Sequence, residues 1–362
     1  ITALEVDFPA VMVGRVAEQE SWRKEIHRPA THTHKWWAQR LGSVFRAVLA
    51  SAVTSSADEA EGVYTSASRF ENLVVFDPFA GSGTTLVEAA KFGAGVVGYD
   101  INPVATLVQR QAVARWDRDG LAEAFNTVEK STRAVIDEYH INHRGETVLY
   151  YFWVALADCP DCDSEVELFS SHVFAKHAYA KKHPIARATC PSCHAVATID
   201  LHSDVRIVCE SCGGTVDLTG PVTGQKMVCP SGHSNRVVDA LGGKVPAYRP
   251  YAKIVLGFDG SKRYEPIDDF DRSLYERASA KLRTCRPDLL LPSGVLEDGY
   301  NTRQALRWGF ESWEDFFNDR QLLSLGLLGR AVSELDCQAA HREALIALFS
   351  GVLEFNNLFC SF

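Results

Sequence analysis

The sequence predicts an α/β fold in which a Rossmann-like parallel sheet is interrupted by a β-rich module and followed by a helical C-terminal part. Three observations predict it. Residues 72–150 alternate apolar strand-like runs with helical patterns. Residues 151–250 contain short β-like runs separated by cysteine, glycine and proline. Residues 251–362 are mixed and then helical, with Ser312 and Asp315 at capping-box spacing before an amphipathic run.

The composition is that of an ordinary globular chain of two or three domains, with 362 residues, 46% hydrophobic and 23% charged. No apolar run reaches the roughly 18 residues of a membrane span, and no secretory signal is visible. The net charge of −9 gives no general attraction for nucleic acid, although a local basic face can provide one. Seven of the ten cysteines lie between Cys159 and Cys229, mostly as C-x-x-C pairs. This spacing is typical of metal binding in a reducing compartment, so we expect a cytoplasmic protein without membrane contact.

Residues 1–60 are expected to form a basic, aromatic and helical segment that packs on the following domain. The stretch "RKEIHRPATHTHKWWAQRLGSVFR" holds six Lys or Arg residues against one Glu. From Trp36 onward the apolar residues have helical spacing. They are Trp37, Leu41, Val44, Phe45, Val48 and Leu49.

Residues 61–150 begin with a strand, a glycine turn, a helix and a second strand. "NLVVFD" is predicted to be a buried strand, "GSGTTLVEAAKFG" starts a helix with Gly93 as its C-terminal cap, and "GVVGYD" is the next strand. This order places backbone N–H groups at the carboxyl end of the sheet, where α/β folds bind ligands.

Three ligands compete for this turn. A phosphate-binding P-loop needs a Lys after the turn, which is absent, and a dinucleotide fingerprint needs a third glycine where Leu86 stands. The third candidate is S-adenosylmethionine, which has no phosphate. Asp77 can accept hydrogen bonds from its ammonium, Gly81 and Gly83 allow close approach, and Asp100 can accept both ribose hydroxyls while Ile101 packs on adenine. The residues favour this third ligand over a plain βαβ turn.

The pattern D-P-F-x-G-S-G-T-T…G-x-D-x-N-P resembles the cofactor motif of DNA methyltransferases that modify exocyclic amino groups. "HKWWAQRL", the cysteine-rich module and "FNDRQLLSLGLL" resemble a subgroup, the adenine-specific DNA methylases that contain a zinc ribbon. The resemblance implies a class I methyltransferase sheet, S-adenosylmethionine as cofactor and DNA as partner. It implies a cofactor site made of Asp77, Pro78, Phe79, Ala80, Gly81, Ser82, Gly83, Thr84, Asp100, Ile101 and Asn102. In the related methylases a segment before the glycine motif packs beside the cofactor, so we add His34 and Lys35, with Thr33 and Trp36 as neighbours that can reach the methionine carboxylate or adenine.

The catalytic motif of that family, Asp/Asn/Ser-Pro-Pro-aromatic, is missing, because the sequence contains no Pro-Pro dipeptide. Asn102-Pro103 is followed by Val104 and is not a substitute. We therefore assign no catalytic residue and expect the motif beyond residue 362, with a second polypeptide or a non-catalytic relative as alternatives. Carbon-5 cytosine chemistry is not expected, because the chain has no Pro-Cys dipeptide to supply the nucleophile.

Four short segments, here called knuckles, each carry two metal-ligating residues. Their eight ligands are enough for two closed, structural zinc sites. The simplest pairing joins the first two knuckles and the last two, although the spacing also satisfies a nested arrangement. Free thiols in loops and a catalytic zinc are less expected. Lys176, Lys181 and Lys182 form a basic patch that suits either phosphate contact or a solvated loop. The ligands are Cys159 with Cys162, Cys190 with Cys193, Cys209 with Cys212, and Cys229 with His233.

The predicted organisation is therefore an N-terminal segment (1–60), a cofactor-binding core (61–150), a zinc-ribbon insertion (151–250) and a mixed, then helical region (251–362). The predicted function is S-adenosylmethionine-dependent transfer of a methyl group to the amino nitrogen of adenine in DNA, by this chain or as the N-terminal portion of an enzyme. Such enzymes commonly serve restriction-modification or phage defence, which suggests a defence or nuclease partner. Cytosine amino methylation, RNA guanine-amino methylation and a non-catalytic zinc DNA-binding subunit are the alternatives.

Overall fold

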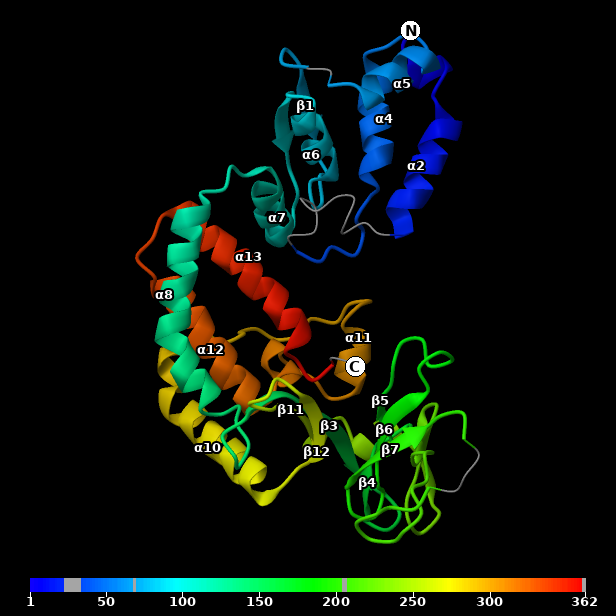
Figure 1. The fold of residues 1–362 in the computed structure, drawn as a ribbon, viewed down its shortest axis with the longest axis vertical. Coiled ribbons are helices and arrows are strands. Elements are labelled where there is room, and N and C mark those ends of the chain that lie inside the picture. Colours follow the sequence, from blue (N-terminus) through cyan, green and yellow to red (C-terminus); the bar gives the residue numbers. More distant parts are fainter. Residues whose placement is uncertain (23–33, 68–69, 204–206, 360–362) are drawn as a thin grey trace. The chain divides into compact units, whose positions relative to one another are not determined.

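The computed structural model describes residues 1–22, 34–67, 70–203 and 207–359, which fold as two compact units (Figure 1). Residues 1–128 and 332–354 make the first unit, and residues 129–331 and 355–362 make the second. Residues 23–33 of the predicted basic segment, including Thr33, lie outside the described residues. No helix of the described part has the length and hydropathy of a membrane span.

The N-terminal part of the first unit is helical. The predicted helix does not start at Trp36, because the carboxylate of Glu20 caps the backbone N–H groups of Gly42 and Ser43, both at 2.8 Å, and the helix begins there. Trp36 and Trp37 therefore precede the helix, and this expectation was wrong. The helices are α1 (Ala3–Val6), α2 (Ala10–Trp22), α4 (Gly42–Ala52), α5 (Ala57–Thr65), α6 (Thr84–Lys91), α7 (Pro103–Val113), α8 (Arg118–Asp137) and α13 (Ala339–Phe355); α8 continues into the second unit.

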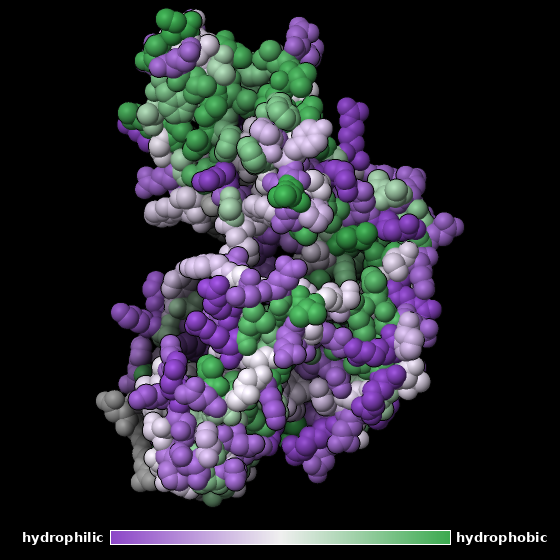
Figure 2. All heavy atoms as spheres, turned by 180° about the vertical axis from the view of Figure 1, so that it is seen from behind, coloured by the Kyte–Doolittle hydropathy of each residue, from purple (hydrophilic) through white to green (hydrophobic). Residues whose placement is uncertain are grey.

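A parallel pair of strands, β1 (Val74–Asp77) and β2 (Gly95–Gly98), forms the sheet of this unit. Helix α6 connects the strands and contacts both of them. The expectation of a buried first strand was wrong, because alternate side chains such as Val74 and Phe76 are 71% and 60% exposed. Figure 2 shows apolar side chains gathered on the surface of this unit, at the top of the view. The mixed α/β class is confirmed, but the described residues pair only two strands in parallel, so a Rossmann-like sheet is not.

The second unit is built on an antiparallel sheet of order β12-β11-β3-β4. Two long strands of this sheet flank the cysteine-rich segment, and the predicted boundaries at residues 150 and 250 fall inside them. Two three-stranded sheets lie between those strands, in agreement with the predicted short β-runs. The bounds are β3 (Thr147–Asp158), β4 (Glu165–Glu167), β5 (Val173–Ala175), β6 (Ile185–Thr189), β7 (Val196–Asp200), β8 (Val222–Thr223), β9 (Lys226–Val228), β10 (Ser234–Arg236), β11 (Ala247–Leu256) and β12 (Lys262–Pro266).

The predicted helical C-terminal part is confirmed. The capping box of Ser312 and Asp315 is present, but it encloses a 3-10 turn, Trp313–Phe316. The amphipathic helix α12 (Asp319–Glu334) starts after that turn. It packs against α10 (Asp269–Cys285) through a cluster of buried leucines. Two short helices, α9 (Val237–Leu241) and α11 (Arg303–Arg307), and the 3-10 turn Arg286–Asp288 complete this unit.

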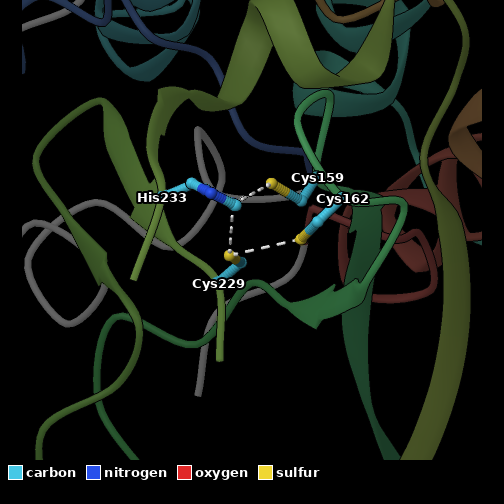
Figure 3. A group of neighbouring side chains, drawn as sticks. All are labelled: Cys159, Cys162, Cys229 and His233. Atoms are coloured by element: carbon cyan, nitrogen blue, oxygen red, sulfur yellow. Dashed lines mark hydrogen bonds between the residues drawn. The ribbon is translucent and has the colours of Figure 1, made fainter. Parts of the chain in front are cut away.

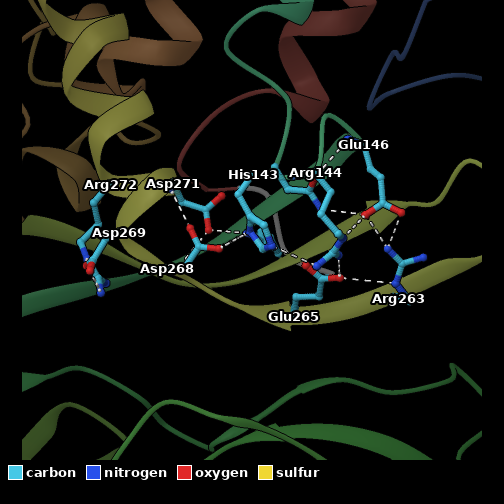
Figure 4. A network of polar contacts seen from close by, with 11 residues as sticks. His143, Arg144, Glu146, Arg263, Glu265, Asp268, Asp269, Asp271 and Arg272 are labelled. Atoms are coloured by element: carbon cyan, nitrogen blue, oxygen red, sulfur yellow. Dashed lines mark hydrogen bonds and ion pairs between the residues drawn. The ribbon is translucent and has the colours of Figure 1, made fainter.

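A polar network joins the sheet of the second unit to helix α10 (Figure 4). Lys253 of β11 is fully buried and lies 2.5 Å from Asp271 in the first turn of α10. Asp268 caps the same helix and also accepts from the ring of His143. A buried charge is tolerated only when it is paired, so this pair fixes how the helix meets the sheet.

Candidate cofactor turn and metal-ligand clusters

The glycine turn follows directly from the end of β1. Oδ1 of Asp77 accepts the backbone N–H of Phe79 at 3.0 Å, which turns the chain out of the strand. Gly81 and Gly83 have φ angles of +53° and +83°, a region that favours glycine, and Gly83 is the N-cap of α6. A Cβ on Gly81 would lie 3.2 Å from Nε1 of Trp36. The turn is therefore tight, and the indole of Trp36 lies against it.

The carboxylate of Asp100, which follows the second strand, holds the glycine turn in place by hydrogen bonds. Its Oδ2 accepts the N–H of Gly81 and its Oδ1 accepts the N–H of Asn102, both at 2.9 Å. Nε2 of Gln109 donates to the carbonyl of Gly81 at 2.8 Å from helix α7. Asn102 in turn caps α7 by accepting the N–H of Val104. The predicted acid is thus at the turn itself, whereas Gln109 gave no signal in the sequence.

The predicted cofactor residues divide by exposure. Phe79 and Ile101 are 89% and 102% exposed, so two apolar side chains flank the turn without being used by the core. Pro78 and Asn102 are also exposed, while Asp77, Gly81 and Asp100 are partly exposed. The remaining four are buried and support the start of α6 rather than present a side chain to a ligand. They are Ala80, Ser82, Gly83 and Thr84.

His34 and Lys35 contact the C-terminal helix instead of the glycine turn. Nε2 of His34 lies 2.8 Å from the hydroxyl of Ser350, and Lys35 forms an ion pair with Glu354. The Lys35 ammonium also lies over the ring of Trp37. Among the described residues of this segment, Trp36 reaches the turn. Its signals in the sequence were the doubled tryptophan and the resemblance, which named it beside His34 and Lys35.

Cys159, Cys162, Cys229 and His233 form the first group of metal-ligand atoms, here called the outer cluster (Figure 3). The Sγ atoms of Cys162 and Cys229 are 3.7 Å apart. Nδ1 of His233 lies 3.5 Å from Sγ of Cys229 and 3.8 Å from Sγ of Cys159. The hydroxyl of Ser164 lowers the pKa of the Cys162 thiol to about 6, which favours the thiolate that a metal needs.

Cys190, Cys193, Cys209 and Cys212 form the second group, the inner cluster. Its measured Sγ–Sγ distances are 3.7 Å between Cys190 and Cys212 and 3.6 Å between Cys193 and Cys209. The pairing of the first two and the last two knuckles was therefore wrong, and the nested alternative is the one present.

The nesting follows from the apolar cores of the module. Cys159 and Cys229 share one buried cluster with Val166 and Met227. Cys190 and Cys209 belong to another, whose members include Ala186, Ile199 and Val216. Each cluster of ligands therefore has its own small core, which brings together knuckles that are not neighbours in the sequence.

The ligand spacing fits a tetrahedral ion. Four bonds of the usual zinc–sulfur length would place sulfur atoms about 3.8 Å apart, close to the distances of both clusters. Within each cluster all four ligand atoms lie within 4.8 Å of one another. Each cluster supplies four protein ligands, so an ion held there has no position left for a substrate.

Comparison with known proteins supports the interpretation of the glycine turn as part of a DNA methylase motif. Residues 64–108 match the family of N6/N4 DNA methylases. A stretch of 66 residues is 36% identical to the Type II methyltransferase M.MvaI of Kocuria varians, and it covers 18% of this chain and 14% of that protein. No solved structure matches the chain. The resemblance to amino-group DNA methyltransferases is thus confirmed for residues 64–108, and this family match ends before the cysteine-rich module.

Proposed function

We propose that this chain, whose residues 64–108 belong to the DNA methylase family, is an S-adenosylmethionine-dependent DNA amino-methyltransferase or a part of one. The observation that supports it most directly is the glycine turn that Asp100 ties to the second strand. A turn of this kind, with an acid at the end of the next strand, suits a ligand that carries a ribose diol and no phosphate.

The residues present fit that cofactor. Asp77 uses Oδ1 for the turn, so its Oδ2 can accept from the cofactor ammonium. Asp100 is partly exposed and can accept the ribose hydroxyls with its second lone pairs. Exposed Phe79 and Ile101 and the indole of Trp36 provide apolar and aromatic surface for adenine. When bound, the cofactor supplies an electrophilic methyl group.

We propose the amino nitrogen of adenine as the target, with the amino nitrogen of cytosine as the alternative that the N6/N4 family match leaves open. The residues that would hold the base are not part of this proposal, because residues 1–362 contain no Pro-Pro dipeptide. A place in restriction-modification or phage defence, with a nuclease as partner, fits this activity and belongs to the proposal.

The two metal-ligand clusters are proposed to hold one zinc ion each, in a structural role. Both are filled by protein ligands, and each stabilises a small core that the short strands cannot form alone. Between β5 and β6 an exposed loop carries Lys176, Lys181 and Lys182, which we propose to contact DNA phosphates.

The test uses protein from the complete reading frame. It is incubated with tritium-labelled S-adenosylmethionine and duplex DNA or bulk tRNA, and the nucleic acid is digested to nucleosides. We expect label in N6-methyladenine from DNA. Asp100→Asn should lose most of the label, whereas Asp119→Asn, an exposed control on α8, should keep it. Label in N4-methylcytosine would replace adenine by cytosine as the target. Labelled guanine from tRNA, or no label in any nucleoside, would contradict the proposal.

A further inference from the structure

The second unit contains a cavity of about 320 Å³ whose walls are largely aromatic. Tyr150 and Trp153 come from β3, Phe174 comes from β5 and Tyr251 comes from β11. Asn318, Arg320 and Gln321 form one part of the polar lining, and Ser171, Asn356 and Asn357 contribute to it as well. This volume lies at the lower end of small-molecule pockets and suits a single flat ring system.

Arg320 provides a buried charge with a free donor. Its side chain is only 3% exposed, and its guanidinium lies 3.7 Å from the ring centre of Tyr151. Nη1 donates to the carbonyl of Tyr139 at 3.1 Å. Nη2 is buried and has no hydrogen-bond partner among the described residues. A buried donor of this kind is expected to be satisfied by a ligand or by water.

Asn318 and Gln321 add further donors beside it. They cap α12 reciprocally, each side-chain oxygen accepting the other residue's backbone N–H at 3.0 Å. Their oxygen atoms are engaged in this way, so their amide nitrogens are the groups available to a ligand. No Asp, Glu or Lys is among the described residues that line the cavity. The polar side therefore favours a ligand with carbonyl oxygens.

His140 adds one acceptor to the same cavity. Its Nδ1 lies 2.9 Å from the carbonyl of Ile136, which identifies Nδ1 as the protonated nitrogen and Nε2 as the one with a lone pair. Burial lowers the pKa of His140, and the charge of Arg320 lowers it further, so the ring is neutral at pH 7. A neutral Nε2 accepts from a ring N–H.

We infer that this cavity binds a nucleobase whose edge alternates carbonyl oxygen with ring N–H, as thymine, uracil and guanine do. Arg320 and the two amides donate to the carbonyl, His140 accepts from the ring N–H, and the aromatic walls stack on the faces. Adenine offers an amino group and no carbonyl, so it is bound less well. The motif "FNDRQ", which the cofactor turn leaves unexplained, thereby gains a role. The inference goes beyond the proposed methyl transfer and does not depend on it.

The base can come from DNA, as an extrahelical nucleotide, or from a free nucleotide. The test measures, without cofactor, the affinity of the protein for a fluorescent duplex that carries one bulged thymine. Comparison duplexes carry a bulged adenine or an abasic spacer at the same place. Thymidine monophosphate and guanosine monophosphate are titrated separately as competitors.

We expect the bulged thymine to bind about tenfold more tightly than the spacer, the size of one base stack on aromatic side chains. Arg320→Gln should remove this difference, whereas Arg283→Gln, an exposed control on α10, should keep it. Since Arg320 is buried and its replacement can disturb folding, Tyr150→Ala, at a 45% exposed wall position, is the second variant and should weaken the preference. Thermal melts of each variant report whether it is folded.

The competition arms identify the source of the base. Displacement by either nucleotide at concentrations similar to the duplex would assign the cavity to free nucleotides. Displacement only at far higher concentration would assign it to DNA. Equal affinity for thymine, adenine and spacer duplexes, with no nucleotide binding by folded wild-type protein, would overturn the inference. A folded Tyr150→Ala variant that keeps the full preference would overturn it as well.

Discussion

The glycine turn and the cysteine-rich module differ in how far apart their parts lie in the sequence. The turn is complete within residues 76–109, and its hydrogen bonds join residues at most 28 positions apart. The outer cluster joins Cys159 to His233 across 74 positions, with the whole inner cluster lying between them. A local motif is fixed by its own residues, whereas the nested clusters are fixed by the strands and small cores around them. Pairing of distant knuckles is therefore decided by topology, not by order along the chain.

The largest effect should come from the metal clusters, because binding at a structural zinc site is also folding energy. Purified wild-type protein should contain two zinc ions. The double variant Cys162→Ser with Cys229→Ser removes ligands from one cluster and should retain one ion. Cys162→Ser with Cys193→Ser damages both clusters and should retain none. Zinc content per chain, measured by inductively coupled plasma mass spectrometry, checks this.

The opposite order of zinc contents in the two double variants would show that adjacent knuckles share a metal site. In that case Cys162→Ser with Cys193→Ser would keep one ion, and Cys162→Ser with Cys229→Ser would keep none. Cys285→Ser, outside both clusters, serves as the control and should keep both ions.

Removing the buried cation of the second unit should have the next largest effect. Lys253→Ala leaves the Asp271 carboxylate buried without its partner, and loss of one member of such a pair costs about 3–5 kcal/mol in the free energy of unfolding. Urea denaturation measures it. Lys281→Ala, at an exposed position of α10, should change the free energy little. Similar values for both variants would show that the pair does not fix α10 to the sheet.

A smaller effect is expected in the glycine turn. Gly83→Ala places a Cβ 3.2 Å from Cγ of Gln109 and forces a left-handed conformation, so it should lower the free energy of unfolding by about 1–2 kcal/mol. Gly14→Ala is the matched control, since Gly14 lies inside helix α2 and its Cβ would meet nothing within 4 Å. That variant should raise stability by up to about 1 kcal/mol. Thermal unfolding of both variants decides; stabilisation by Gly83→Ala would contradict the turn geometry.

The smallest effect separates the two tryptophans. Trp36→Ala should raise the Kd for S-adenosylmethionine about tenfold, the size of one ring stack, because this indole lies at Gly81. Trp37→Ala removes a side chain that is 88% exposed and should leave the Kd unchanged. Isothermal titration calorimetry compares them. If Trp37→Ala were the more damaging variant, the segment would approach the cofactor by a different face.

The sequence was sufficient for the features that depend on near neighbours. The glycine turn, the following helix with Gly93 in the left-handed conformation, the parallel strands and the eight metal-ligand residues could all be placed from local patterns. The exposure of Val74 and Phe76 could not be predicted, since an apolar run does not show how many strands or helices will cover it. The capping of α4 by Glu20 was equally hidden, because it joins residues 22 positions apart.

The cavity around Arg320 is a second feature that could not be predicted from the sequence, because its walls come from distant segments. The motif "FNDRQ" was visible as a resemblance, but its neighbours Tyr150, Phe174 and Tyr251 come from three strands that are distant in the sequence. Only the folded sheet brings them together. For the same reason Trp36 and Gln109, which hold the glycine turn from outside its motif, could not be ranked from spacing alone.

The account depends most on the claim that the glycine turn holds S-adenosylmethionine. Calorimetric titration of the zinc-loaded protein with this cofactor tests it directly. We predict one site per chain with a Kd between about 1 µM and 1 mM, the range of enzyme substrates, and a loss of at least about tenfold in Asp100→Asn, as expected for a charged hydrogen bond. Absence of binding by folded wild-type protein, or equal affinity in folded Asp100→Asn, would contradict the account.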